Sequence, residues 1–312
     1  MKNQTIIIIG SGVSGLACAA KLQQAGLKPT VYDKGRNIGG RLATRRTRNG
    51  LQFDHGAQYM TAKTPEFREV LHEAQKNGKV GEWDLGHRVR YVGVPGMSGF
   101  AEFISKGVDV KQDVEASSVK ETADGYNIQM GDQVVFAHKL VITTPAPQTM
   151  ELLGDQHPLT SELVDVELEP CLTLMVNFDL QAPIDCVARQ DSDDPISWIA
   201  MDSSKPKRTT QHCWVAHASP SWSAEFIEEE KSAIAERMLP LVCERLGLST
   251  SNVVYAVAHR WRYAAVSKPL GRPFAKSSNG ALYLGGDWCL DARVEAAWTS
   301  GNAIATEILR ET

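Results

Sequence analysis

The N-terminal region carries two apolar runs on either side of a segment rich in small residues. Residues 5–9 are β-branched and almost wholly apolar, which is typical of a central parallel strand buried on both faces. Residues 16–25 have a helix-like pattern, and Gly26 follows them as a C-terminal stop signal. A second apolar run over residues 29–32 predicts another strand, which ends at Asp33. The pattern therefore predicts a strand–helix–strand unit.

The rest of the chain predicts helices and short strands in mixed order. Asn49-Gly50, between the strand-like segments 44–47 and 51–54, is a strong hairpin signal. Residues 65–77 carry apolar positions at helical spacing, and residues 224–246 predict a long helical stretch that Pro240 would divide. Further strands are expected within residues 110–142, 171–178, 196–201, 212–218 and 253–263.

Length and composition describe an ordinary globular chain. At roughly 150 residues per domain, 312 residues suggest about two domains. A hydrophobic content of 43% and a charged content of 22% exclude an extended disordered chain. The net charge of −4 provides no global field for nucleic acid, and no apolar run approaches the roughly 18 residues that would span a bilayer. We therefore expect neither nucleic acid nor a membrane as a partner.

Cysteine and histidine spacing gives no metal or redox motif. No two cysteines form a CxxC pair, and the histidines form no HxH or HExxH motif, so we expect no metal site. Scattered cysteines fit a reducing compartment, and we expect a cytoplasmic location. The six cysteines are Cys18, Cys171, Cys186, Cys213, Cys243 and Cys289.

The segment between the first two predicted strands reads Gly10-Ser11-Gly12-Val13-Ser14-Gly15. Gly10 permits a tight turn, Gly12 lets a pyrophosphate approach the backbone, and Gly15 lets the helix pack closely on the strand. The amides and dipole at the helix N-terminus then favour phosphate charge. Asp33 lies 23 residues after Gly10, where a carboxylate accepts hydrogen bonds from an adenosine ribose and disfavours a 2′-phosphate. These features predict a dinucleotide site.

Further motifs resemble the flavin amine oxidase superfamily. Gly39-Gly40-Arg41 follows the acid, and segments 54–60, 141–145, 280–287 and 293–298 supply later blocks in the order of that family. Within the superfamily the chain is most similar to the renalases. That likeness rests on Gly-Ala-Gln-Tyr at 56–59, on segment 90–97 and on His259-Arg260-Trp261-Arg262-Tyr263. The resemblance implies an α/β fold of the two-domain α+β kind found in p-hydroxybenzoate hydroxylase and the amine oxidases.

The positions of these motifs predict a nucleotide-binding domain that other segments interrupt. We expect a Rossmann-like FAD-binding domain built from residues 1–60, 100–150 and 276–312. A β-rich substrate domain would comprise the inserted residues 61–99 and 151–275. The resemblance also implies that the last helix, from Arg293 onward, begins beneath the flavin, where its dipole stabilises negative charge on the reduced ring.

The resemblance implies that FAD is the cofactor and that it is bound non-covalently. The chain has no glycine-framed cysteine of the kind that carries covalent flavin in monoamine oxidases, and Cys289 lies in a different setting. Asp287 and Val294 are implied to lie near the ribityl chain and the isoalloxazine edge. The full set of expected cofactor-binding residues is Gly10, Gly12, Ser14, Gly15, Asp33, Lys34, Gly40, Arg41, Gly56, Ala57, Gln58, Tyr59, Met60, Val114, Gly286, Asp287, Val294 and Glu295.

The likeness to renalases implies an oxidase of isomeric dihydro-NAD(P). A 2-dihydro or 6-dihydro isomer would give hydride to flavin N5 and become NAD(P)+, and O2 would reoxidise the flavin with release of H2O2. No second GxGxxG with a following acid is present, so a nicotinamide must bind as a substrate in the other domain. The alternatives are a flavin amine oxidase or desaturase, with Lys268 as a possible flavin-side lysine, and a non-catalytic FAD-binding redox sensor. Nothing in the sequence marks an oligomeric state.

Candidate substrate residues are aromatic. Trp261 and Tyr263 lie two apart on a predicted strand, so they face the same side and form one wall of a flat pocket. Tyr59 is a further candidate, and His259 is a weaker polar candidate on the same side as Trp261. Arg260 and Arg262 would face the opposite way.

Two groups of basic residues are candidates for contact with phosphate. Among Arg41, Arg45, Arg46 and Arg48, we expect Arg41 to help bind the FAD pyrophosphate and Arg48 to be exposed to solvent. Residues 205–208, which read Lys-Pro-Lys-Arg, are expected to form a solvated loop, with contact to a dinucleotide substrate as the alternative.

Overall fold

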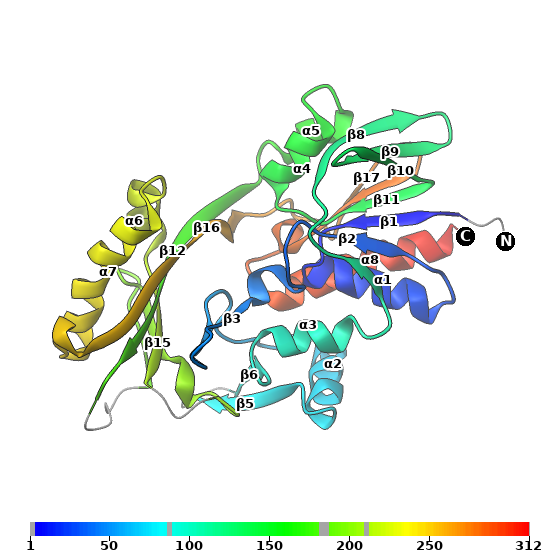
Figure 1. Ribbon diagram of the computed structural model, residues 1–312. Coiled ribbons are helices and arrows are strands. Elements are labelled where there is room, and N and C mark those ends of the chain that lie inside the picture. The colour runs from blue at the N-terminus through cyan, green and yellow to red at the C-terminus, as the bar shows by residue number, and fades with distance from the viewer. Residues whose placement is uncertain (1–3, 86–88, 181–186, 209–211, 312) are drawn as a thin grey trace.

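The computed structural model describes residues 4–85, 89–180, 187–208 and 212–311. Figure 1 shows two sheet-containing halves joined by long strands. One of the six cysteines, Cys186, lies outside the described residues, and the other five are free thiols. No helix in the described ranges is long and apolar enough to cross a membrane.

A six-stranded sheet forms the centre of the half that the sequence predicts to bind a nucleotide, which we call the nucleotide-binding half. Its strands lie in the order β17 (Ala275–Lys276), β18 (Leu282–Leu284), β11 (Lys139–Ile142), β1 (Ile6–Ile9), β2 (Thr30–Tyr32) and β7 (Asp109–Lys111). All neighbouring pairs are parallel except β17 with β18. Because β1 is central, its four isoleucines are all buried, as its apolar run predicted.

Alternate isoleucines of β1 face two different layers. Ile6 and Ile8 pack with α1 (Val13–Gln24) and α8 (Val294–Arg310), which cover one face of the sheet. Ile7 and Ile9 pack towards the other face. That face is covered by the small sheet β10 (Gln133–Ala137), β9 (Gly125–Met130) and β8 (Ala116–Thr122), with α4 (Ala146–Leu153) and α5 (Pro158–Leu163).

A five-stranded sheet forms the other half. Its order is β13 (Ala188–Gln190), β14 (Trp198–Met201), β15 (Cys213–His217), β12 (Glu167–Phe178) and β16 (Val253–Lys268). Helices α6 (Pro220–Phe226) and α7 (Lys231–Leu246) cover its outer face, and β12 and β16 extend from this sheet towards the nucleotide-binding half (Figure 1). The opposite face of the sheet is therefore free to form a site between the halves.

The remaining elements connect the halves. They are the hairpin β3 (Thr44–Arg46) and β4 (Gln52–Asp54), helix α2 (Pro65–Lys76), the hairpin β5 (Val80–Asp84) and β6 (Val89–Gly93), and helix α3 (Ser98–Ile104). Short 3-10 turns are η1 (Gly40–Leu42), η2 (Asp202–Ser204), η3 (Thr250–Asn252) and η4 (Asp287–Cys289). The predicted hairpin at Asn49-Gly50 and the helix predicted over 65–77 are both confirmed.

The helical stretch predicted over residues 224–246 is divided, but the division expected at Pro240 is wrong. Two helices, α6 and α7, occupy this region, and the break falls at residues 227–230. Pro240 lies inside α7, on an exposed position. Because water can hydrate the carbonyl group that the proline leaves without a donor, the helix continues through it.

Candidate active site

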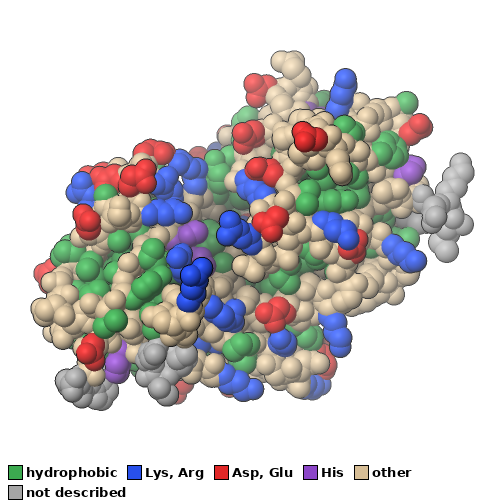
Figure 2. All heavy atoms as spheres, viewed as in Figure 1, with side chains coloured by type: hydrophobic (Ala, Val, Ile, Leu, Met, Phe, Trp, Pro, Cys, Tyr) green, Lys and Arg blue, Asp and Glu red, His purple; other side chains and the backbone are tan. Residues whose placement is uncertain are grey.

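A large cleft lies between the two halves. Its volume is about 1540 Å³, and it is lined by Ile9 and Tyr32 at the carboxyl ends of β1 and β2, and by residues of the five-stranded sheet. Figure 2 shows histidine and basic side chains gathered where the surface is hollowed between the halves. Ordinary small-molecule pockets have volumes of roughly 300–1,000 Å³. The cleft therefore has room for a dinucleotide and a second ligand.

The glycine loop opens into one end of the cleft. Gly10 has a φ of 104°, which only glycine adopts readily. A Cβ on Gly15 would lie 2.0 Å from the Gly10 carbonyl oxygen, so Gly15 permits the close contact between helix and strand. A Cβ on Gly12 would meet nothing within 4 Å, because this residue faces the cleft. This geometry agrees with the tight turn predicted at Gly10 and with the close helix–strand packing predicted at Gly15.

Asp33 is tied to the glycine loop. Its Oδ2 accepts hydrogen bonds from Ser11 N at 2.5 Å and Ser11 Oγ at 2.9 Å, and its Oδ1 accepts one from Gly35 N at 2.6 Å. The residue also lines the cleft. These bonds fix the carboxylate in place beside the loop, and a carboxylate oxygen has lone pairs left for a further donor.

Two residues from opposite ends of the chain meet at the middle of the cleft. Arg41 Nη1 donates to Asp287 Oδ2 at 2.7 Å, and Arg41 Nη2 donates to Asp287 Oδ1 at 2.6 Å. Arg41 Nη1 also donates to the Ala264 carbonyl oxygen at 2.9 Å, which ties the pair to β16. Both charged residues line the cleft. A bidentate pair of this kind is rigid as well as strong.

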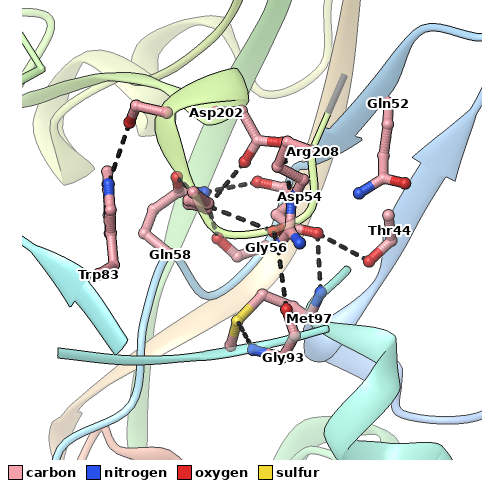
Figure 3. A network of polar contacts seen from close by, with 12 residues as sticks. Thr44, Gln52, Asp54, Gly56, Gln58, Trp83, Gly93, Met97, Asp202 and Arg208 are labelled. Carbon is pink, nitrogen blue, oxygen red and sulfur yellow. Dashed lines mark hydrogen bonds and ion pairs between the residues drawn. The ribbon is translucent and has the colours of Figure 1, made fainter. Parts of the chain in front are cut away.

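The wall formed by residues 56–60 rests on a buried charge cluster. Lys205 Nζ lies 2.6 Å from Asp202 Oδ1 and 3.3 Å from Asp54 Oδ2, and Arg208 Nη2 lies 2.5 Å from Asp54 Oδ2 (Figure 3). The four side chains are at most 1% exposed. Lys205 Nζ also donates to Gln58 Oε1 at 3.3 Å, and Gln58 lines the cleft. The cluster thus supports one wall of the cleft from behind.

The solvated loop predicted over residues 205–208 is wrong for two of its charged residues. Lys205 and Arg208 are buried because Asp54 and Asp202 compensate their charge, and only Lys207 is exposed. The two cations hold the pKa of the Asp54 carboxyl below its usual value. Burial and the neighbouring Asp54 charge raise the pKa of Asp202.

A row of side chains crosses the five-stranded sheet and faces the cleft. Trp198 pairs with His217 on the next strand, His217 pairs with Thr173, and Thr173 pairs with His259. Residues directly opposite one another on neighbouring strands share a face. Trp198, His217 and His259 all line the cleft, while Thr173 is buried between the two histidines. We call Trp198, His217, Thr173 and His259 the sheet row.

Two further aromatic side chains extend the sheet row along β16. Trp261 and Tyr263 line the cleft with His259, as their spacing predicted. The rings of His259 and Trp261 lie 4.4 Å apart, and Trp261 Nε1 donates to the His55 carbonyl oxygen at 2.8 Å. We call the sheet row together with Trp261 and Tyr263 the aromatic floor; its rings are not coplanar, since the planes of His259 and Trp261 are tilted by 60°.

Arg260 and Arg262 extend their side chains away from this floor. Arg262 pairs with Glu228 and Arg260 donates to the Glu229 carbonyl oxygen, on the side of the sheet that carries α6 and α7. These partners agree with the opposite orientation predicted for the two arginines, although both residues also contribute to the lining of the cleft.

The histidines around the cleft are neutral at physiological pH. Burial lowers the pKa of His217 and of His55 to about 4, and it lowers the pKa of His259 to about 3. Neighbouring cations add to the effect, with Lys205 acting on His217. Neutral imidazoles can donate or accept hydrogen bonds here but carry no charge.

The structure places most of the expected cofactor-binding residues on the cleft. These are Gly10, Gly12, Asp33, Lys34, Gly40, Arg41, Gly56, Ala57, Gln58, Tyr59, Met60, Val114, Asp287 and Val294. Four others lie behind its surface. Ser14 and Gly15 are buried in the first turn of α1, the amide of Gly286 donates to Ser300 Oγ, and Glu295 accepts hydrogen bonds from residues 63 and 64.

Sequence reasoning did not distinguish Trp198 from the other tryptophans of the expected substrate domain, and it missed His217 and Arg90 as cleft residues. The first two face the cleft only because of strand register across the sheet, which spacing along the chain does not reveal. Lys268, the lysine considered for an amine oxidase, pairs with Asp165 at 3.2 Å and does not line the cleft. In the described ranges, no group of His, Cys, Asp or Glu side chains is placed to hold a metal ion.

The donor set of the cleft fits a flavin dinucleotide. The open side of Gly12 lets a phosphate reach the backbone, and the N-terminus of α1 adds its dipole. Asp33 lies within the same cleft for a ribose, and the cleft extends past Arg41 and Asp287 to the aromatic floor. The glycine loop, the acid and this continuous cleft define a Rossmann-like protein of the dinucleotide-binding class.

Comparison with known families identifies the class more narrowly. The family model described as "NAD(P)-binding Rossmann-like domain" matches residues 8–74, and the model described as "Flavin containing amine oxidoreductase" matches residues 82–309. The chain belongs to the flavin-containing amine oxidoreductase family, and its cofactor is FAD.

Curated relatives match only part of the chain. Protoporphyrinogen oxidase 2 of Arabidopsis thaliana is 35% identical over 100 residues, which cover 31% of this chain and 19% of that protein. The 4,4'-diaponeurosporene oxygenase of Staphylococcus haemolyticus is 39% identical over 61 residues, which cover 20% of this chain and 12% of that protein. The matches therefore span about a fifth or less of these relatives' length.

Solved structures match the whole chain at low identity. A putative protoporphyrinogen oxidase from Exiguobacterium sp. 255-15 has a TM-score of 0.81 and 12% identity over 100% of both chains. Wild-type putrescine oxidase bound to putrescine has a TM-score of 0.73 and 12% identity, over 98% of this chain and 99% of that one. At these identities the likeness shows the fold, which is the two-domain α/β arrangement that the sequence predicted.

Proposed function

We propose that this protein is an FAD-dependent oxidase of the renalase type, which oxidises 2-dihydro or 6-dihydro isomers of NAD(P). The overall reaction takes one dihydronicotinamide, O2 and a proton to NAD(P)+ and H2O2. The observation that carries the proposal is that the aromatic floor and the glycine loop line one continuous cleft, which has room for a dinucleotide and a second ligand. Bound FAD supplies the hydride acceptor.

The floor residues would bind and orient a flat ring. Trp261 and Tyr263 lie along β16, and Trp198 lies at the far end of the sheet row. Stacking on such side chains recognises a flat ring without a charged partner. The hydrogen bond from Trp261 to the His55 carbonyl oxygen holds the indole in one orientation.

The chemistry needs no strong base in the substrate half of the cleft. The carboxylates that line the cleft are Asp33, Glu115, Glu151 and Asp287, and none of them lies on the five-stranded sheet. His217 and His259 are neutral and weakly basic, since their pKa values lie at about 4 and about 3. Oxidation of a dihydronicotinamide makes an aromatic ring and removes no proton from carbon, so this lining suits it.

The binding mode we propose for the cofactor follows the residues that line the cleft. Gly12 and Asp33 would hold the adenosine diphosphate part, and Arg41, Gln58, Tyr59 and Asp287 would lie along the rest. Cys289 is buried outside the cleft, and Cys171, which lines it, has a pKa raised to about 12 by burial. A thiol that stays protonated is a poor nucleophile, which supports non-covalent flavin. We also propose the domain division at residues 1–60, 100–150 and 276–312.

A second candidate function is oxidation of a porphyrinogen or an amine. Relatives and fold neighbours named above include protoporphyrinogen oxidases and putrescine oxidase, and a porphyrinogen also has ring edges that an aromatic floor would contact. Lys63 and Lys34 are the lysines that line the cleft. A lysine on the cleft is the feature that would suit amine chemistry.

Anaerobic reduction of the bound flavin distinguishes these functions. The FAD-loaded protein is mixed with 2-dihydro-NAD, 6-dihydro-NAD, ordinary NADH, putrescine and protoporphyrinogen, and the visible flavin band is followed. Fast bleaching by a dihydro isomer is expected. Bleaching by putrescine or the porphyrinogen alone would overturn the proposal, and bleaching by none of them would favour the redox sensor.

A further inference from the structure

One end of the cleft is lined by three cations without an ionic partner. Lys63 precedes α2, Arg68 lies in the first turn of α2, and Arg90 lies on β6; we call these three residues the cation cluster. Across the described part of the chain, no carboxylate forms an ion pair with any of their side chains. Lys63 and Arg68 are exposed and Arg90 is partly buried. The cleft therefore carries uncompensated positive charge at this end.

Backbone and ring contacts place the members of the cation cluster near one another. Met60 N donates to the Tyr91 carbonyl oxygen at 2.7 Å, and Tyr91 N donates back to Met60 at 3.0 Å, which joins β6 to the wall that leads into α2. The ring of His72 lies 6.4 Å from the Tyr91 ring. Arg68 lies one helical turn before His72 on the same face of α2. Arg68 thus lies near the strand that carries Arg90, and both arginines line the cleft.

The carboxylate of Glu295 does not neutralise the cation cluster. Its Oε2 accepts a hydrogen bond from Lys63 N at 2.9 Å, and its Oε1 accepts bonds from Thr64 N and Thr64 Oγ, each at 2.7 Å. The residue is buried, and these bonds hold its pKa below the usual value. The charge of Glu295 thus fixes the backbone before α2 and leaves the side chains of the cluster open.

The cation cluster is continuous with the aromatic floor. The Arg90 guanidinium lies 4.7 Å from the centre of the Tyr59 ring, and that ring lies 5.8 Å from Trp198 at the end of the sheet row. Arg90 Nε and Trp198 Nε1 are both buried donors without an acceptor. Both residues line the cleft, so a polar ligand bound beside them would supply the missing acceptors.

We propose that the cation cluster is an anion subsite for the pyrophosphate of a dinucleotide substrate. This rests on the proposed function, since it assigns the phosphates of the same substrate whose ring lies on the aromatic floor. The glycine loop serves the pyrophosphate of the cofactor, so a second dinucleotide needs a second source of positive charge. Arg68 and Arg90 supply guanidinium groups that suit phosphate oxygens, and Lys63 adds a third charge.

The test measures binding apart from oxidation. ADP-ribose, which has the pyrophosphate but no oxidisable ring, is titrated by calorimetry into FAD-loaded wild type, Arg68→Gln, the double variant Arg68→Gln/Arg90→Gln and the control Arg310→Gln, whose side chain is exposed on α8. We expect the dissociation constant to rise about tenfold for Arg68→Gln and further for the double variant, and to stay unchanged for the control. Flavin content should be equal in all four proteins.

Steady-state kinetics separate the subsite from general packing. For a dihydro-NAD isomer, the two variants should raise KM and leave kcat nearly unchanged, while KM for the matching dihydronicotinamide riboside, which lacks phosphate, should not move. Equal losses for both substrates would overturn the proposal, as would wild-type affinity of the variants for ADP-ribose.

The outcomes also distinguish the two proposals. If no dihydro isomer reduces the flavin but ADP-ribose binding still depends on Arg68, the proposed function fails and the subsite stands. If coproporphyrin III, a tetracarboxylate, binds in an Arg68-dependent way and ADP-ribose does not bind, the pyrophosphate assignment is overturned in favour of carboxylates.

Discussion

Arg41 and Asp287 are separated by 246 positions in the chain and form a two-pronged ion pair at 2.7 and 2.6 Å. Arg41 follows Gly39-Gly40, and Asp287 follows β18, the strand beside β11 in the six-stranded sheet. Asp287 is 8% exposed and Arg41 is 31% exposed, so the pair is partly withdrawn from water. The contact closes the nucleotide-binding half of the cleft and reaches β16 through the Ala264 carbonyl group.

Removing Arg41 should weaken FAD binding. Arg41→Ala leaves the Asp287 carboxylate partly buried without its partner and removes a cation from the cofactor wall, so the dissociation constant for FAD should rise at least tenfold. The measurement is flavin absorbance per protein after gel filtration, followed by titration of the apoprotein with FAD. Arg48→Ala, at an exposed position of the same basic segment, should retain wild-type FAD content. Unchanged FAD retention in Arg41→Ala would contradict the proposed cofactor map.

Two glycines of the same loop should respond in opposite ways to alanine. Gly12 has a φ of −68° and open space at its Cβ, so Gly12→Ala should fold normally but obstruct the phosphate and lose FAD. Gly15→Ala places a methyl group 2.0 Å from the Gly10 carbonyl oxygen and should unfold the domain or lower the free energy of unfolding by several kcal/mol. Thermal unfolding and flavin content of the two apoproteins are compared. Loss of stability in Gly12→Ala would show that its open face has a structural role.

Breaking the buried charge cluster should be costly. Lys205→Met leaves Asp54 and Asp202 close together in the interior with only Arg208 to compensate them, and the free energy of unfolding should fall by about 3–5 kcal/mol. Lys207→Met, two residues away and exposed, should change it by less than about 0.5 kcal/mol.

A second substitution tests the charge balance within the cluster. Adding Asp202→Asn to Lys205→Met removes the unpaired negative charge and should recover part of the loss. Urea unfolding of Lys205→Met, Asp202→Asn and the double variant measures the coupling free energy between Lys205 and Asp202. Additive losses would show that packing, and not charge, explains the effect.

Stability should fall as the pH is lowered from 6.5 towards 4. Burial lowers the pKa of His217 from 6.5 to about 4, so in this window the unfolded chain binds a proton that the folded protein does not. The free energy of unfolding contributed by one such group falls by about 1.4 kcal/mol per pH unit, and the contribution is constant above pH 6.5. His217→Gln should reduce this slope in urea unfolding between pH 4 and 7. An unchanged slope would assign the proton uptake to other groups.

Local signals were sufficient for the nucleotide end of the cleft. Gly10, Gly12 and Gly15 have roles that depend on their own backbone and on a strand and helix adjacent in sequence, and Asp33 ends the next strand. The β-branched run at residues 6–9 also identifies a strand buried on both faces. Such features can be read from a few consecutive residues because the physical cause is local.

The substrate end depends on contacts that are distant in the chain. In the sequence, Lys205 and Arg208 resemble residues of a solvated loop. The carboxylate that compensates their charge in the interior, Asp54, lies about 150 residues earlier in the chain. Trp198 and His217 face the cleft through the register of three adjacent strands, which no spacing within one strand records. Long-range charge compensation and strand register were therefore the parts of the site that sequence could not predict.

The sheet row also determines how the substrate range of this chain can be altered by engineering. Its cleft-facing members Trp198, His217 and His259 lie on three different strands, and each is held by ladder hydrogen bonds rather than by contacts to the glycine loop. Side chains can therefore be exchanged at these positions, one at a time or together, while the nucleotide frame around Gly12 and Asp33 is retained. Trp198 and His217 also contact Tyr59 and Gln58 of the wall proposed for the cofactor, so libraries at the sheet row should be screened for flavin content as well as for new donors.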